Sequence, residues 1–223
     1  MGPDFDEFYT QKRSSHARRG LRRKRKMLGD GGPHIFRGTD EATIERIVDV
    51  LVEQRNARAV TSGILSVFVV PGVRDLYRDV LIDSLSATSG PLAEAHALEV
   101  DGIIRATYIG GTHHGRDSCH LNSFREDELK NATPGEQLLL DVLKCCCERG
   151  LTQLDLGIGE MSYKVSWCKP DPLFDSSLPM TALGRLHALL AETKQSVKRS
   201  IKANPLLWKT ILKLRRLRSH SHG

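Results

Sequence analysis

The order of the predicted elements in the middle of the chain constrains the fold more than any other feature. Alternating and periodic apolar residues predict three strands, a helix and a final strand, in that order: 96–100, 103–109, 118–124, 134–149 and 151–156. Asp101-Gly102 is typical of a tight hairpin turn, so the three strands form an antiparallel meander. A strand that is joined to the next through a helix pairs with it in parallel. The sequence therefore predicts an α/β (α+β) fold, with a mixed sheet flanked by helices.

The chain before the meander is predicted to be mostly helical. A short strand is expected over 34–37, and Thr39 is expected to cap a helix that ends near Ala59. A second helix is predicted over 73–86, with an apolar face made by Leu76, Val80, Leu81 and Leu85. The apolar run 64–70 fits either a buried strand or an apolar loop.

Both ends of the chain are basic, and the middle is acidic. Residues 1–29 carry nine Lys/Arg and three Asp/Glu, and residues 193–223 carry nine Lys/Arg and no acid, so the net charge of +6 leaves an acidic body. A nucleic-acid binder usually carries its basic patch on the fold itself, so nucleic acid is not an expected partner. Basic ends also suit an anionic membrane or an acidic substrate.

Three segments are expected: a basic N-terminal helix within 1–30, a folded domain over 31–182, and a basic helical extension over 183–223. The first helix is predicted over 4–28, before the Gly-rich stop at 29–33. In the extension, residues 204–218 have apolar residues on one side and basic residues on the other. This stretch suits an anionic membrane surface, the chain's own domain or a partner subunit. Docking on the domain is favoured, because most apolar helix faces are buried within their own protein.

The composition indicates a soluble, cytoplasmic protein. The first residues are acidic and do not resemble a signal peptide, and the apolar run 64–70 is too short to span a bilayer. Three of the five cysteines are adjacent on one predicted helix, at 145–147, so they do not form a disulfide framework. Small apolar cysteines of this kind are typical of a reducing compartment.

The start of the helix over 134–149 combines several signals. Thr133 and Glu136 fit a capping box, Pro134 occupies the first helical position, and Gly135 leaves room for a ligand to approach. The free N–H groups at a helix N-terminus favour a pyrophosphate. The alternative interpretation is a well-capped helix without a ligand.

Further motifs carry a resemblance to a known family. They are Gly20-Leu21-Arg22-Arg23, Pro134-Gly135, and the series Asp155, Gly159, Glu160, Tyr163, Lys164 and Trp167. With them the chain resembles the GNAT acetyltransferase domain of the cellulose-biosynthesis (CelD-like), FemAB-like type. The resemblance implies an acyl-CoA donor such as acetyl-CoA. It also implies a splayed sheet, with the thioester between the third meander strand and the strand after the crossover helix. The segment 130–135 lacks the usual Gly-rich phosphate loop of that superfamily.

The resemblance also implies site residues. Coenzyme A would be held by the backbone of Asn122, Ser123 and Phe124 and by the helix start at Thr133, Pro134, Gly135 and Glu136. Tyr163 would protonate the leaving thiolate, and Lys164 would stabilise negative charge or hold a phosphate. Asp155 and Glu160 are candidates for the base. The alternatives are a tyrosine half-buried against the sheet with its hydroxyl in water, a solvated surface lysine, and an Asp155 that only bonds the backbone at its strand end.

The predicted function is acyl transfer from coenzyme A to an amine or hydroxyl. The acceptor would be a small molecule or glycan precursor in polysaccharide or cell-envelope synthesis. The alternatives are an inactive GNAT-like binding or assembly module and a FemAB-like, aminoacyl-tRNA-dependent transferase. A second GNAT-like half or a homodimer is a further expected partner. No metal is expected, because the histidine cluster over 113–120 matches no zinc pattern and reads as a polar hairpin turn.

Overall fold

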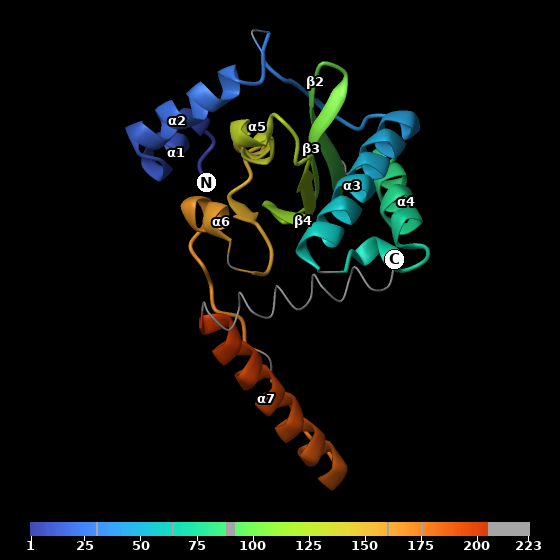
Figure 1. The fold of residues 1–223 in the computed structure, drawn as a ribbon. Helices are drawn as coiled ribbons and strands as arrows, with labels where there is room; N and C mark the ends of the chain where they lie inside the picture. Colours follow the sequence, from blue (N-terminus) through green and yellow to red (C-terminus); the bar gives the residue numbers. More distant parts are fainter. Residues whose placement is uncertain (30, 64, 88–91, 160, 175, 205–223) are drawn as a thin grey trace. The chain divides into compact units, whose positions relative to one another are not determined.

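The computed structural model of the protein (Figure 1) describes residues 1–29, 31–63, 65–87, 92–159, 161–174 and 176–204. The chain divides into two compact units, and each is described by itself. The first unit contains Met1–Asn56 and Ser66–Pro170, and the second contains Ala57–Leu65 and Asp171–Gly223. All five strands belong to the first unit.

A five-stranded sheet in the order β1-β2-β3-β4-β5 forms the centre of the first unit. The strands are β1 (His34–Arg37), β2 (Ala93–Val100), β3 (Ile103–His113), β4 (Arg116–Phe124) and β5 (Gln153–Asp155). The first four are antiparallel, and β5 lies parallel to β4 after the crossover helix α5 (Pro134–Glu148). Asp101 and Gly102 have φ values of 52° and 75°, as a type I′ hairpin turn requires. The predicted meander and mixed α/β sheet are therefore confirmed.

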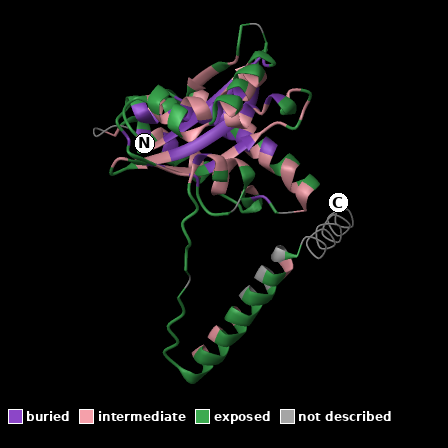
Figure 2. Ribbon diagram, turned by 90° about the vertical axis from the view of Figure 1, so that its left-hand side faces the viewer, coloured by how far each residue is buried: buried purple, intermediate pink, exposed green. Residues whose placement is uncertain are grey.

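Helices cover both faces of the sheet (Figure 1). On one face, α3 (Glu41–Ser62) and α4 (Val73–Leu85) bury aliphatic side chains against the strands, among them Ile47, Leu51 and Leu81. On the other face lies α5, whose predicted core positions are all buried: Leu139, Val142, Leu143 and Cys146. α1 (Phe5–Lys12) and α2 (Ser15–Lys26) pack on α5. The strands between these layers are largely buried (Figure 2).

The N-terminal segment forms two helices, so the prediction of one helix over 4–28 is wrong. Arg13 is extended, with φ −124° and ψ 129°. The hydroxyl of Ser14 then accepts a hydrogen bond from the Ala17 amide at 3.3 Å and caps α2. Serine competes with a continuing helix because its side chain satisfies the free amides of a new one.

Two details of α3 also differ from the prediction. The cap of α3 is Asp40, which accepts from the Thr43 amide at 2.8 Å, rather than Thr39, and α3 runs on to Ser62. The run 64–70 contains a short 3-10 turn (Val67–Val69), so the loop alternative holds for its described part.

The apolar face predicted for α4 is largely exposed. Leu76, Val80 and Leu85 are 59 %, 48 % and 42 % exposed, and only Leu81 of the predicted set is buried. The buried residues of α4 are Leu81 and Ser84. The face that packs on the sheet includes the polar residue Ser84. A search for apolar residues does not find such a face, so the prediction chose the wrong side of the helix.

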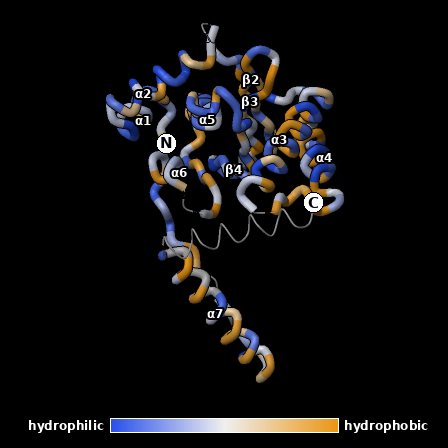
Figure 3. Tube along the Cα trace, in the orientation of Figure 1, coloured by the Kyte–Doolittle hydropathy of each residue, from blue (hydrophilic) through white to orange (hydrophobic). Residues whose placement is uncertain are grey.

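The second unit contains the long helix α7 (Ala182–Ala203). Apolar and polar residues alternate along it (Figure 3), and its leucines are exposed to solvent. The amphipathic stretch predicted over 204–218 lies outside the described residues after Asn204.

Candidate active site

One edge of β4 is open beyond the end of β5. The parallel pairing recorded between the two strands starts at Arg116 and ends at Ser118, whereas β4 continues to Phe124. Among the described residues, no strand pairs with the second half of β4 on this side, the part of the sheet where the resemblance implies the thioester.

The register of β4 shows which backbone groups point to this open edge. The amide of Arg125 donates to the carbonyl of Arg105 on the β3 side at 2.8 Å. Two residues before Arg125, Ser123 lies opposite Thr107 of β3, so it bonds to β3 in the same way. In an antiparallel pair, residues that bond to the partner strand alternate with residues whose N–H and C=O point away from it. The backbone groups of Asn122 and Phe124 therefore point to the open edge.

The side chain of Asn122 joins β4 to the helix that follows β5. Its amide nitrogen Nδ2 donates to the hydroxyl of Tyr163 at 3.0 Å, across 41 residues of sequence. Tyr163 lies on the short helix α6 (Ser162–Trp167) and is half-buried against the core under α5. Two predicted site residues thus meet at the open edge of β4.

A cysteine lies beside this pair. The Sγ atom of Cys119 is 3.6 Å from Nδ2 of Asn122, and burial raises the pKa of the Cys119 thiol to about 12. A thiol that stays protonated at neutral pH is a poor nucleophile. Cys119 therefore packs against the site without the chemistry of a catalytic cysteine.

The N-terminus of α5 lies next to the end of β4. A β-carbon added to Gly135 would be 3.6 Å from the ring of Phe124, an ordinary contact distance. Thr133 has a left-handed backbone (φ 52°), and its side chain makes no capping hydrogen bond. The predicted capping box is therefore wrong, because a left-handed residue does not direct its side chain at the first helical amides.

Glu136 has a different partner from the one predicted. Its carboxylate pairs with the Arg13 guanidinium at 3.1 Å, and the Arg13 group also lies 4.8 Å from the ring centre of the buried Trp167. The amides of Glu136 and Gln137 both bond to the carbonyl of Thr133, so these two amides are already engaged. The helix start is thus tied to the N-terminal helices and to α6.

The family model of the acetyltransferase (GNAT) domain matches residues 6–165, which include the sheet, the open edge and Tyr163. The chain belongs to this family. No curated protein matches it significantly.

Among solved structures, a conserved protein of unknown function from Bacteroides thetaiotaomicron is similar to part of this chain. It shares 16 % sequence identity at a TM-score of 0.39, over 65 % of this chain and 44 % of that one. The chain thus spans less than half of the length of that protein.

Two other predicted residues of the GNAT domain are engaged in local structure. Lys164 donates to the carbonyls of Gly157 and Ile158, both at 3.2 Å. Asp155 accepts from the Gly157 amide at 2.8 Å and pairs with Arg116; that amide and that guanidinium hold the pKa of the Asp155 carboxyl below its usual range. Both side chains order the loop after β5, and Glu160 lies outside the described residues.

Arg55 is a further candidate site residue, which the sequence analysis missed. It lies on α3, and its guanidinium donates to the carbonyl of Asn122 at 3.3 Å, so it reaches the open edge of β4 from the opposite face of the sheet. An arginine within a helix is usually read as solvated. Only the packing of α3 over β4 identifies it.

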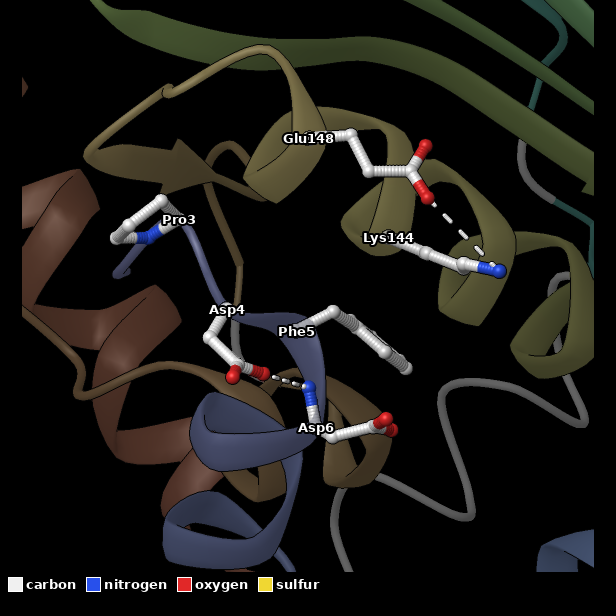
Figure 4. A pocket seen from close by; sticks show the side chains of 6 residues that line it. All are labelled: Pro3, Asp4, Phe5, Asp6, Lys144 and Glu148. Carbon is white, nitrogen blue, oxygen red and sulfur yellow. Dashed lines mark hydrogen bonds and ion pairs between the residues drawn. The ribbon is translucent and has the colours of Figure 1, made fainter.

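A separate hollow of about 550 Å³ lies over α1 and the second half of α5 (Figure 4). Three of its charged side chains are engaged within the chain: Lys144 pairs with Glu148 at 3.8 Å, and Asp4 accepts from the Asp6 amide at 2.8 Å. Within the residues that the structure describes, no cluster of His, Cys, Asp or Glu is arranged to hold a metal. In the same part of the chain, no helix is long and apolar enough to cross a bilayer.

Proposed function

We propose that this GNAT domain transfers an acyl group, in the simplest case acetyl, from coenzyme A to an amine or hydroxyl acceptor. The hydrogen bond between Asn122 and Tyr163 at the open edge of β4 carries the proposal. Acyl transfer breaks a C–S bond and forms a C–N or C–O bond; the acceptor gives up a proton to a base, and the thiolate takes one up. A phenol is a suitable donor for the thiolate, so we assign this role to Tyr163.

The residues around the open edge fit a thioester. The N–H groups of Asn122 and Phe124 point there and are suitable donors for a carbonyl oxygen that gains negative charge. Gly135 at the start of α5 would face the phosphates, where the helix dipole favours negative charge. A base for the acceptor is not assigned, since Asp155 is engaged by Gly157 and Arg116.

The variant Tyr163→Phe tests the catalytic assignment. We expect a loss of about 100- to 10,000-fold in kcat, the range of general acid catalysis, with little change in the Kd of acetyl-CoA. Release of the coenzyme A thiol is measured over a panel of amines and amino sugars. Tyr77→Phe is the matched control, because Tyr77 is half-buried on α4, against Phe68. Equal kcat values for the two variants would remove Tyr163 from the mechanism.

The variant Gly135→Ala tests the binding assignment. The added methyl group makes only ordinary contacts with Phe124, so the fold should be kept and helix propensity slightly improved. If coenzyme A approaches this backbone closely, its Kd should rise about tenfold, which corresponds to ~1.4 kcal/mol. An unchanged Kd would mean that the phosphates do not bind at the start of α5.

A catalytically inactive binding or assembly module is the second candidate. It is favoured by the Glu136 and Gln137 amides, which bond to the Thr133 carbonyl and leave fewer donors for a pyrophosphate. Calorimetry with acetyl-CoA and longer acyl-CoAs separates the two functions. Binding without turnover, or no binding, supports the module; turnover with any acceptor supports the transferase.

We further propose a glycan-precursor acceptor and a cytoplasmic setting. All five cysteines are free thiols, which supports a reducing compartment. The amino sugars in the acceptor panel test the first point. A preference for amino acids or simple amines over amino sugars would contradict it.

A further inference from the structure

A second cavity, of about 180 Å³, lies between α1, α2 and α5. Its polar lining includes Tyr9 from α1, Arg18 and Arg22 from α2, and Gln137 from α5, over an apolar floor that includes Leu21. None of these residues belongs to the open edge of β4. The cavity is therefore a feature of the N-terminal helices and the outer side of α5.

Two deeply buried side chains that line the cavity have polar atoms without a protein partner. Gln137 is fully buried, and its amide nitrogen Nε2 donates to the Leu21 carbonyl at 2.9 Å, which fixes the orientation of the amide. Its Oε1 atom and the hydroxyl of Tyr9, whose side chain is 8 % exposed, have no hydrogen-bond partner among the described residues. Buried polar atoms are nearly always paired in folded proteins, so these atoms call for a polar partner from outside the chain.

The charge of the lining indicates the sign of that partner. Arg25 is neutralised by Asp141 at 2.6 Å, but no ion pair is recorded for Arg18 or Arg22 within the described part of the chain. The Nε atom of Arg18 is also buried without a partner. One carboxylate, Asp6, lines the same cavity, so the lining keeps an excess of positive charge.

We propose that this cavity binds a sugar-phosphate group. Arg18, Arg22 and the Tyr9 hydroxyl supply donors for phosphoryl oxygens, and Oε1 of Gln137 accepts from a sugar hydroxyl. The volume is below the ~300–1,000 Å³ of sites that take a whole small molecule, which fits one phosphorylated sugar. The group comes either from the 3′-phosphoribose of coenzyme A or from a separate sugar phosphate. The proposal stands without the transferase function, because it needs no turnover.

Calorimetry on the full chain tests the cavity with three probes: coenzyme A, 3′-dephospho-coenzyme A and ribose 5-phosphate. Arg22→Gln removes one charge from the lining, and Tyr9→Phe removes only the hydroxyl. Arg23→Gln is the matched control, because Arg23 is equally exposed on the same helix and does not line the cavity. We expect the Kd of the phosphorylated probe to rise about tenfold in Arg22→Gln and about threefold in Tyr9→Phe, the scale of charge-assisted hydrogen bonds. The Kd should not change in Arg23→Gln.

The pattern across the probes identifies the source of the group. If Arg22→Gln weakens the binding of coenzyme A but not that of 3′-dephospho-coenzyme A, the cavity holds the 3′-phosphoribose. If it weakens the binding of ribose 5-phosphate but not that of coenzyme A, the cavity holds a separate sugar phosphate. The proposal is overturned if neither coenzyme A nor ribose 5-phosphate distinguishes Arg22→Gln from Arg23→Gln. Failure of the transferase function appears separately, as coenzyme A binding without turnover.

Discussion

Two amphipathic helices of this chain, α5 and α7, use similar patterns of leucine with opposite results. In α5, leucines such as Leu138 and Leu143 are each 1 % exposed and lie between the sheet and the N-terminal helices. In α7, Leu186 and Leu190 are 55 % and 62 % exposed. Periodicity predicts that a helix forms with an apolar face, but it does not say what covers that face.

The flanking residues explain the difference for α5. It follows β4 directly and precedes β5, so the crossover fixes it on the sheet. α7 has no such strand pairing in the described part of the chain. Its apolar face, followed by a C-terminal sequence that is basic and lacks acids, suits a surface outside the protein. We propose an anionic membrane surface as that partner.

The largest expected effect is the loss of a core leucine from α5. Leu143→Ala should lower the free energy of unfolding by about 2–5 kcal/mol, because it leaves a cavity in a packed core. Leu190→Ala in α7 should change it by less than about 0.5 kcal/mol. Urea denaturation measures both. Similar losses in the two variants would mean that α7 is as well packed as α5, and would break the comparison.

Acid should destabilise the first unit through His96. Burial lowers the pKa of His96 from 6.5 to about 4. Between these values the unfolded chain takes up a proton that the folded chain refuses, so the free energy of unfolding should fall as the pH drops from 6.5 towards 4, by up to about 3 kcal/mol.

The replacement His96→Gln should flatten this pH dependence, measured by urea denaturation at several pH values. His187→Gln is the control, since His187 is exposed on α7. A pH slope that survives in His96→Gln, or disappears in His187→Gln, would assign the acid sensitivity elsewhere.

The smallest expected effect concerns the exposed face of α7. The double variant Leu186→Ser, Leu190→Ser should weaken binding to anionic vesicles about tenfold, because each leucine loses apolar area that would enter the lipid interface. The melting temperature should not move. Cosedimentation with anionic and with zwitterionic vesicles gives the measurement. Equal binding of the double variant and the natural sequence, or equal binding to both vesicle types, would argue against a membrane partner.

Much of the sheet was predictable because its signals are local. The Asp101-Gly102 turn, the alternation along β2 and the apolar stripe of α5 each lie within a few residues of what they determine. The family motif also gave Tyr163 as a candidate, and the structure brings it to Asn122. Local pattern was sufficient for these elements.

Two of the remaining features depend on distant contacts. Glu136 pairs with Arg13 across 123 residues instead of closing a local capping box, and Arg55 reaches Asn122 across 67 residues. The break between α1 and α2 follows from the Ser14 cap, a local signal that the basic run beside it obscured. The long-range contacts of Glu136 and Arg55 produce no periodic pattern in the sequence from which they could be predicted.

The docking of the first helix against the last part of the GNAT domain has a consequence for synthesis on the ribosome. Arg13 contacts the Ser166 carbonyl, 153 residues later in the chain, and Tyr9 stacks on Trp167 with ring centres 6.0 Å apart. α1 therefore leaves the exit tunnel long before the residues on which it packs, and it completes its packing only after they have followed. Until Trp167 has been translated, Tyr9 lacks one of the rings that cover it in the finished protein.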